Sequence, residues 1–194
     1  MSKSERTRQF IIEQSLPLFN TKGVAGTAMS DIMEATKMAK GGLYGHFESK
    51  EELSYAVVDY SLQVLGEKVM LFINKHKTAK GKLFAYLDFF NQGHCALEGG
   101  CPMLNFGMEA DDTNPVITQK IKHNIERSEK LISSIITDGI TNGEFKKTWN
   151  ADDFAVKAFA VLEGGTMIAR VMGSYTQMET IVRILKNEIE EQVR

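Results

Sequence analysis

The chain has 194 residues, of which 43% are hydrophobic and 25% charged, and it contains three prolines. This composition is that of a folded globular protein and excludes an intrinsically disordered chain. No run of about 18 apolar residues occurs, so we expect no membrane-spanning helix, and the first residues lack the apolar core of a signal peptide. We therefore expect a cytoplasmic protein whose two cysteines, Cys95 and Cys101, stay reduced.

The net charge of −2 argues against a general nucleic-acid binder, but the charge is unevenly distributed. Residues 1–50 carry seven basic and five acidic side chains, an excess of +2, and the remainder carries −4. A basic beginning followed by an acidic body suits a protein that meets DNA with one end only.

Hydrophobic residues recur at helical spacing along nearly the whole chain, and no alternating strand pattern is present. We predict an all-α fold of about nine helices. The expected helices cover about 5–22, 28–36, 40–46, 49–76, 79–97, 102–110, 115–141, 151–172 and 176–192. Pro17 should kink the first of these helices near Glu13, and Gly23 stands where a helix end is expected.

The second and third predicted helices are short and are separated by a tight turn, which is the layout of a helix-turn-helix. Their apolar side chains can pack against each other and against the first helix; they are Met29, Ile32, Met33, Met38, Leu43 and Phe47. The outer side of the second short helix then presents Lys40, Gly41, Gly42, Tyr44 and His46. In a helix-turn-helix this helix enters the major groove.

The residue types on this outer side suit contact with DNA. Glycine lets a backbone approach the DNA closely, and lysine can pair with phosphate or with a guanine edge. Tyr44 and His46 can donate to phosphate, and Lys50 adds a positive charge at the start of the next helix. The alternative is that these side chains are ordinary surface or core groups of a helical hairpin.

Residues 8–55 resemble the TetR family of bacterial transcription regulators. The matching residues are Arg8, Ile11, Ile12, Leu18, Phe19, Gly23, Thr27, Asp31, Ile32, Gly41 or Gly42, Leu43, Tyr44, His46, Phe47, Ser49, Lys50, Glu52 and Leu53. The resemblance implies a three-helix DNA-binding domain over residues 1–49 and a larger helical ligand-binding and dimerisation domain over residues 50–194. It implies DNA contacts from Thr27, Ala28, Lys40, Gly41, Gly42, Tyr44, His46 and Lys50.

Three positions depart from the family pattern. Ala28 stands where the family often has Ser or Thr, so Thr27 would have to supply the helix cap or phosphate contact. Lys37 stands where a turn glycine is common, so the turn must tolerate a side chain. Gly45 stands where a larger residue often reaches a base, which reduces base contacts there.

The resemblance also implies a homodimer in which the last two helices of each subunit pack as four helices. The expected interface residues are Phe154, Ala158, Val161, Leu162, Gly165, Ile181, Ile184 and Leu185. A pocket for an apolar or aromatic effector is expected among Met70, Phe89, Phe90, Met103, Phe106 and Met108, which could equally be core residues.

Cys101 precedes a proline at the predicted start of a helix, where a reactive thiol would suit a redox or electrophile sensor. The alternative is a small buried apolar residue. We expect Glu109, Asp111 and Asp112 to cap and solvate a loop rather than to bind a metal, and we expect no cofactor.

The sequence favours a repressor that binds a palindromic double-stranded DNA operator and is released by a small molecule. Two other functions remain open. One is a helical interaction protein that has lost DNA binding. The other is an enzyme on a helical bundle, against which stands the lack of a paired Glu-x-x-His motif, of a nucleophile near a base, and of a phosphate-binding loop after a strand.

Overall fold

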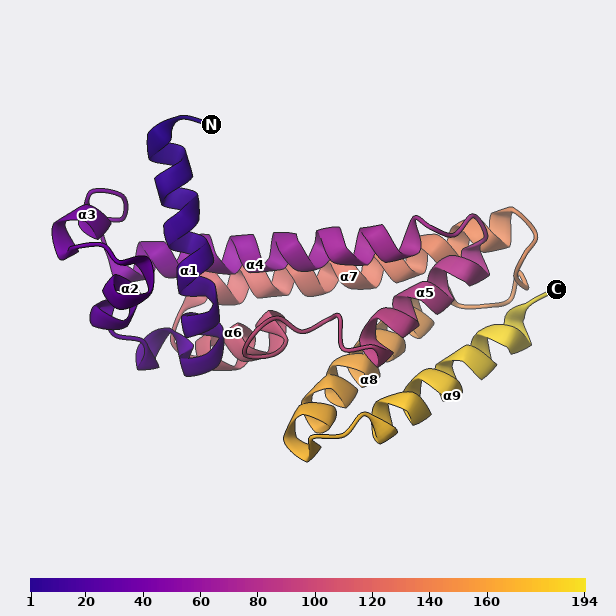
Figure 1. The fold of residues 1–194 in the computed structure, drawn as a ribbon. Helices are drawn as coiled ribbons and strands as arrows, with labels where there is room; N and C mark the ends of the chain where they lie inside the picture. The colour runs from indigo at the N-terminus through magenta and orange to yellow at the C-terminus, as the bar shows by residue number, and fades with distance from the viewer. The chain divides into compact units, whose positions relative to one another are not determined.

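The computed structural model describes residues 1–194 and contains nine α-helices and no strand, which confirms the all-α prediction (Figure 1). The helices are α1 (Lys3–Gly26), α2 (Met29–Thr36), α3 (Lys40–Tyr44), α4 (Lys50–Ile73), α5 (Ala79–Asn91), α6 (Pro102–Ala110), α7 (Pro115–Thr141), α8 (Ala151–Met172) and α9 (Thr176–Gln192). None of them is long and apolar enough to span a bilayer.

The chain divides into two compact units, each built from two segments of the sequence. The first unit comprises Met1–Val64 and Ala96–Lys122, and the second comprises Leu65–Cys95 and His123–Arg194. The long helices α4 and α7 each contribute residues to both units. The sequence predicts a DNA-binding domain that ends at residue 49 and a ligand-binding domain that follows it. This boundary does not coincide with the two compact units, and the functional division stays a prediction.

Serine caps stand at the starts of α1 and α4. The helix α1 begins at Lys3, two residues before the expected start at about residue 5, and α4 begins at Lys50, one residue after the expected start. The Ser2 hydroxyl accepts from the amide of Glu5 at 3.2 Å, and the Glu5 carboxylate accepts from the amide of Ser2 at 2.6 Å. At the start of α4 the Ser49 hydroxyl accepts from the amide of Glu52 at 3.0 Å. These bonds satisfy amides that have no partner inside their own helix.

The break in α1 lies at Gly23. Pro17 lies inside α1, yet Gly23 is the residue of this helix with non-helical angles, at φ 79° and ψ 164°. The expected kink near Glu13 stays a prediction, and the last turn, from Val24 to Gly26, follows the non-helical Gly23. A positive φ of this kind favours glycine.

The helix α5 ends six residues earlier than predicted, because a glycine cap stops it. Gly93 has φ 71°, its amide donates to the carbonyl oxygen of Phe90, and the amide of His94 donates to that of Phe89. This pair of bonds is a Schellman motif, which terminates a helix by satisfying its last carbonyls. Apolar residues continue at helical spacing beyond Asn91, so the sequence pattern did not indicate that the helix ends there.

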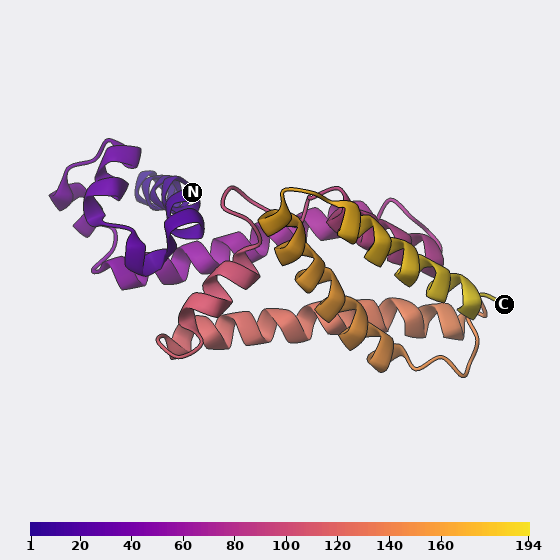
Figure 2. The same cartoon turned by 90° about the horizontal axis from the view of Figure 1, so that it is seen from below.

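In the second unit, α5, α8 and α9 lie side by side in both views (Figures 1 and 2). Phe89 and Phe90 form an aromatic core with ring centroids 5.9 Å apart. A second aromatic group joins Trp149 to Phe145 and Phe154, with centroid distances of 4.9 and 5.0 Å. The sides of α8 and α9 that face this core carry Phe154, Leu162, Val182 and Leu185.

Candidate DNA-binding surface

The helix-turn-helix has the apolar core that the sequence predicts. Ile32, Leu43 and Phe47 are buried, as are Ile11 and Phe19 of α1, and α2 packs against both α1 and α3. Met29, Met33 and Met38 are half-buried at the margin of this core. Burial of each large apolar side chain contributes about 1.5–3 kcal/mol, so the short helices are held by tertiary packing rather than by their own length.

The turn between α2 and α3 is made without glycine. Lys37 has φ 56° and ψ 28°, the left-handed conformation that usually costs a non-glycine residue about 1–2 kcal/mol. Its side chain is exposed, so the turn tolerates it as expected. The result is an additional positive charge beside α3.

The outer side of α3 faces solvent. Lys40, Gly41 and Gly42 are exposed, and Tyr44 keeps 41% of its surface accessible. The Lys40 ammonium nitrogen lies 5.8 Å from the centre of the Tyr44 ring, within the range of a cation–π contact. A Cβ atom added at Gly41 would meet no atom within 4 Å, so a surface could approach this backbone closely.

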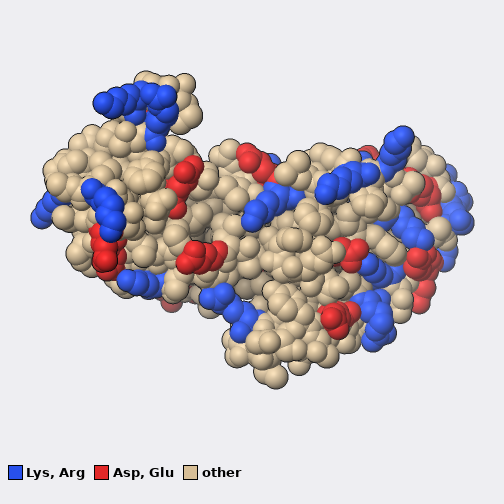
Figure 3. All heavy atoms as spheres, viewed as in Figure 1, with Lys and Arg blue, Asp and Glu red and all other residues tan.

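Charge on this part of the molecule is mixed. On the face drawn in Figure 3, basic side chains around α1 to α3 are interspersed with acidic ones and form no continuous band. Asp31 is one such acid; the amide of Ala28 donates to it at 3.1 Å and Lys22 pairs with it at 3.1 Å. Both contacts lower the pKa of the Asp31 carboxyl group, and the hydrogen bond from the Ala28 amide has the larger effect.

Two residues predicted to contact DNA form hydrogen bonds within the protein. Thr27 is buried, and its hydroxyl donates to the carbonyl oxygen of Gly23 at 2.7 Å rather than capping α2. The Lys50 ammonium donates to the carbonyl oxygens of Val24 at 2.8 Å and Thr27 at 2.9 Å. Both side chains satisfy the backbone at the α1–α2 junction, and their expected contacts with DNA stay predictions.

The remaining predicted positions are accessible to different degrees. Ala28 is the exposed N-cap residue of α2, and His46 is half-buried just beyond α3. The carbonyl oxygen of His46 accepts from the Arg8 guanidinium, which also stacks on the Phe47 ring at 3.9 Å. The roles of Ala28 and His46 in DNA binding stay predictions.

Arg8 also ties α1 to the start of α4. Its guanidinium donates to the Glu52 carboxylate at 2.7 Å, and this bond, with a second from the amide of Glu48, lowers the pKa of Glu52. Because both side chains are partly exposed, the ion pair adds little stability by itself. It instead fixes the orientation of α1 relative to the residues that follow α3.

A set of polar contacts that the sequence did not reveal anchors the end of α1 to the residues around α6. The Glu109 carboxylate accepts from the amides of Val24 at 2.9 Å and Ala25 at 2.8 Å. Asn105 donates to the carbonyl oxygen of Asn20 at 2.8 Å. We expected Glu109 to cap a loop. It does cap backbone amides, but the amide of Val24 lies 85 positions away in sequence, and no local sequence pattern indicates such a contact.

The six residues predicted to line an effector pocket are divided between the two units. In the second unit, Phe89 and Phe90 are core residues, and Met70 lines a shallow surface depression with Glu67, Leu71, Asn74 and Lys75. In the first unit, Phe106 lines a cavity, Met103 is half-buried, and Met108 is 73% exposed. Met108 lies on the solvent-facing side of α6 in this chain, and the expected effector pocket stays a prediction.

Neither thiol is accessible in this conformation. Cys101 is buried at the N-cap of α6. Cys95 is buried as well, 3.6 Å from the Thr166 hydroxyl, and burial raises the pKa of its thiol to about 11. A cysteine sensor needs a thiolate that the reagent can reach. The burial of Cys101 argues against this role, which stays a prediction.

Most of the expected dimer residues are buried inside a single chain. They are Phe154, Ala158, Leu162, Gly165 and Leu185. A Cβ atom at Gly165 would lie 2.8 Å from Ile181, so this side of α8 packs on α9 within one chain. Of the eight expected residues, Val161 and Ile184 are exposed, and Ile181 is half-buried.

The exposed side of α8 carries a second apolar stripe, which sequence periodicity left unassigned. Its members recur every three or four residues; they are Val156, Ala160, Gly164, Met167 and Val171. Met167 is 54% and Val171 79% exposed. Because α8 is apolar on two sides, the sequence pattern alone could not tell which side faces the core.

Comparison with known proteins identifies the family. Residues 11–57 match the model for bacterial regulatory proteins of the tetR family, and residues 81–185 match the tetracyclin repressor-like C-terminal domain. The sequence is 38% identical to that of a TetR transcriptional regulator from Chloroflexus aurantiacus, whose crystal structure superposes with a TM-score of 0.94. The match covers 100% of this chain and 99% of that one.

Two further relatives agree. A TetR-family regulator from Cytophaga hutchinsonii is 35% identical, with a TM-score of 0.94 over 100% of this chain and 98% of that one. The HTH-type transcriptional repressor DhaR of Mycobacterium sp. (strain GP1) is 24% identical over 165 residues, which are 84% of this chain and 82% of that protein. With its helix-turn-helix in α1 to α3, the chain belongs to the TetR family of DNA-binding transcriptional regulators.

Proposed function

We propose that this protein is a repressor that binds a palindromic operator as a homodimer and is released by a small-molecule effector. The observation that carries the DNA-binding part is the division of α3 into a buried side, Leu43, and an exposed side, Lys40, Gly41 and Tyr44. A helix of this kind, held by its apolar side, presents its outer side to the major groove. The repressor assignment is supported by the relative DhaR, which is named as a repressor.

The exposed apolar stripe of α8 supports the homodimer. Isolated exposed apolar residues are common, but a continuous helical stripe marks an interaction surface. Gly164 lies within the stripe and would accept a Cβ atom with nothing within 4 Å, which leaves room for close helix approach. A two-fold dimer places two recognition helices about 34–36 Å apart on a palindromic site.

Release follows if the effector binds more tightly to the conformation that does not fit the operator. The operator affinity then falls by the difference between the two effector affinities, typically about 1–3 kcal/mol. The DNA contacts in this proposal come from Lys40, Gly41, Gly42, Tyr44 and His46, with Ala28 at the start of α2.

The test is a fluorescence-anisotropy titration of the protein against DNA from upstream of its own gene, at two salt concentrations. We expect saturable binding that resists competitor DNA and weakens as salt rises. Replacing Tyr44 by Ala should abolish this binding while the far-ultraviolet circular dichroism stays unchanged. The matched control is Tyr175→Ala, since Tyr175 is similarly exposed but lies in the second unit. Equal binding by wild type and Tyr44→Ala would contradict the assigned surface.

A further inference from the structure

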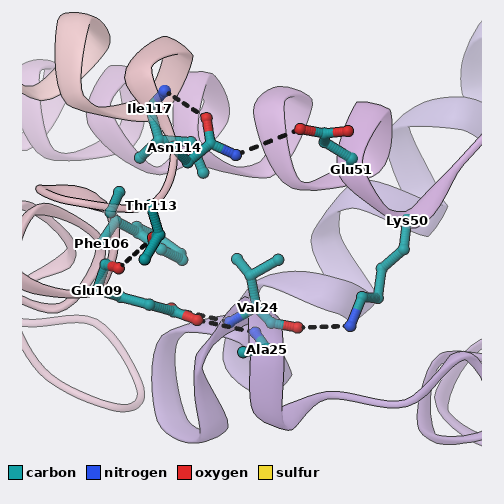
Figure 4. A pocket seen from close by; sticks show the side chains of 10 residues that line it. Val24, Ala25, Lys50, Glu51, Phe106, Glu109, Thr113, Asn114 and Ile117 are labelled. Atoms are coloured by element: carbon teal, nitrogen blue, oxygen red, sulfur yellow. Dashed lines mark hydrogen bonds between the residues drawn. The ribbon is translucent and has the colours of Figure 1, made fainter.

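The first unit contains a cavity of about 260 Å³ beside the junction between α1 and α2 (Figure 4). Its wall is formed by the last turn of α1, the start of α4, α6 and the start of α7. The residues that line it are Val24, Ala25, Lys50, Glu51, Phe106, Glu109, Ala110, Thr113, Asn114 and Ile117. All of them belong to one compact unit.

The charged groups of this wall are already paired with the protein. The Glu109 carboxylate accepts from two amides and the Lys50 ammonium donates to two carbonyl oxygens. Glu51 accepts from the hydroxyl of Tyr55 at 2.6 Å. The cavity is partly open to solvent, so an ion entering it would lose part of its hydration and would have to compete with these existing partners, which is unfavourable.

The open part of the wall is apolar. Phe106, Ala110 and Ile117 are buried, and the side chain of Val24 points from the α1–α2 junction into the space (Figure 4). Thr113 donates to the carbonyl oxygen of Glu109 at 2.7 Å, and the side-chain oxygen of Asn114 accepts from the amide of Ile117 at 3.1 Å (Figure 4). Their oxygen atoms keep a free lone pair each, which can accept one hydrogen bond from a ligand. An enclosed apolar cavity of about 150 Å³ holds benzene, and pockets for larger ligands begin at about 300 Å³. The size therefore fits a single ring.

We propose that this cavity binds a compact, uncharged, apolar molecule of single-ring size, with at most one hydroxyl group to bond at the edge formed by Thr113 and Asn114. The site goes beyond the proposed function, since it requires neither DNA binding nor a particular effector. Its occupant packs against Val24 and Ala25, whose amides are held by Glu109. Binding therefore protects the segment that leads into α2.

The test uses benzyl alcohol as the probe, with benzoate and benzylamine as charged analogues of the same ring, on the full chain without DNA. Saturation-transfer nuclear magnetic resonance should give a dissociation constant of about 1 mM for benzyl alcohol, as expected for a ligand of this size. Both charged analogues should bind more than about tenfold more weakly. Affinity for benzoate or benzylamine equal to that for benzyl alcohol, or no saturable binding up to about 20 mM of the alcohol, overturns the proposal.

Cavity-filling variants locate the site. Val24→Phe should weaken binding of benzyl alcohol by more than about tenfold, because the added ring occupies the space. The control is Val116→Phe, since Val116 is exposed beside the cavity without lining it, and this variant should bind like wild type. Ala110→Leu enlarges a second lining residue, on α6, and gives a second test if Val24→Phe does not fold.

Amide hydrogen exchange provides an independent readout. Saturating benzyl alcohol should slow exchange in the segment around Val24 and Ala25. Unchanged exchange there, or full binding by both cavity-filling variants, would place the ligand elsewhere and reject this site. Operator binding is measured separately, so a failure of the proposed function remains distinguishable from a failure of this inference.

Discussion

The side-chain amide of Asn105 donates to both the backbone carbonyl oxygen of Asn20, at 2.8 Å, and its side-chain oxygen, at 3.1 Å. The same nitrogen also lies 2.9 Å from the carbonyl oxygen of Gly99. In turn, Asn20 donates to the carbonyl oxygen of Gly100 at 3.0 Å. Asn20 is buried, so these bonds satisfy polar groups that water does not reach, and they join α1 to the loop before α6.

Replacing Asn105 by Ala should lower the free energy of unfolding of the first unit by about 2–3 kcal/mol, because carbonyl oxygens are left without a donor. The measurement is urea denaturation followed by circular dichroism. The control is Asn187→Ala on the exposed surface of α9, which should change stability by less than about 0.5 kcal/mol. Equal effects of the two substitutions would show that the Asn105 contacts contribute nothing specific.

Gly99→Ala should be among the most destabilising single substitutions. Gly99 has φ 94°, and a Cβ atom would lie 2.5 Å from the carbonyl oxygen of Asn20, so the backbone itself would have to move. We expect a loss of more than about 3 kcal/mol in urea denaturation. Gly143→Ala is the matched control, because Gly143 has φ 79° but open space around it. It should cost about 1–2 kcal/mol, the conformational strain alone.

The left-handed conformation of Lys37 predicts that glycine at this position is more stable than alanine. Lys37→Gly should raise the free energy of unfolding relative to Lys37→Ala by about 1 kcal/mol, because glycine adopts φ 56° without steric cost. The comparison with alanine removes the contribution of the lysine side chain. Thermal denaturation of the two variants measures the difference. An alanine variant as stable as the glycine variant would mean that the turn does not strain its residue.

The burial of the thiols predicts slow modification. At pH 8 the Cys95 thiol is protonated, because burial raises its pKa to about 11, and an aromatic disulfide reagent should react with the native protein far more slowly than with the unfolded protein. The rate should rise as pH increases toward 11, since the thiolate fraction increases. Cys101→Ser and Cys95→Ser variants separate the two sites. Fast native reaction of Cys101 alone would instead support its role as a sensor.

The exposed stripe of α8 predicts the effect of a charge on assembly. If the proposed homodimer forms through this stripe, Met167→Glu should convert it to a monomer in analytical ultracentrifugation, because the substitution buries an unpaired carboxylate at the interface. Met108→Glu places the same charge on an exposed methionine of α6 and should leave the dimer intact. A dimer that persists in Met167→Glu would place the interface on another surface.

The sequence by itself determined the all-α class and most helix ends. The Ser2 and Ser49 hydroxyls cap amides within one turn of their own helices, so the starts of α1 and α4 depend on local sequence, although α1 begins two residues before its expected start. The packing of Ile32, Leu43 and Phe47 followed from their spacing for the same reason. The family resemblance of residues 8–55 identified the DNA-binding helices, and the matching family model supports it.

Only the tertiary structure decided which surfaces these helices present. Lys50 could face phosphate or the protein, and two carbonyl oxygens at the α1–α2 junction hold it inward. The helix α8 is apolar on two sides, and contact with α9 selected the side with Leu162 for the core and left Met167 exposed. Glu109 finds its partners 85 positions away. Periodicity specifies that a face is apolar, but the choice of its partner depends on contacts between segments distant in sequence, which no local pattern records.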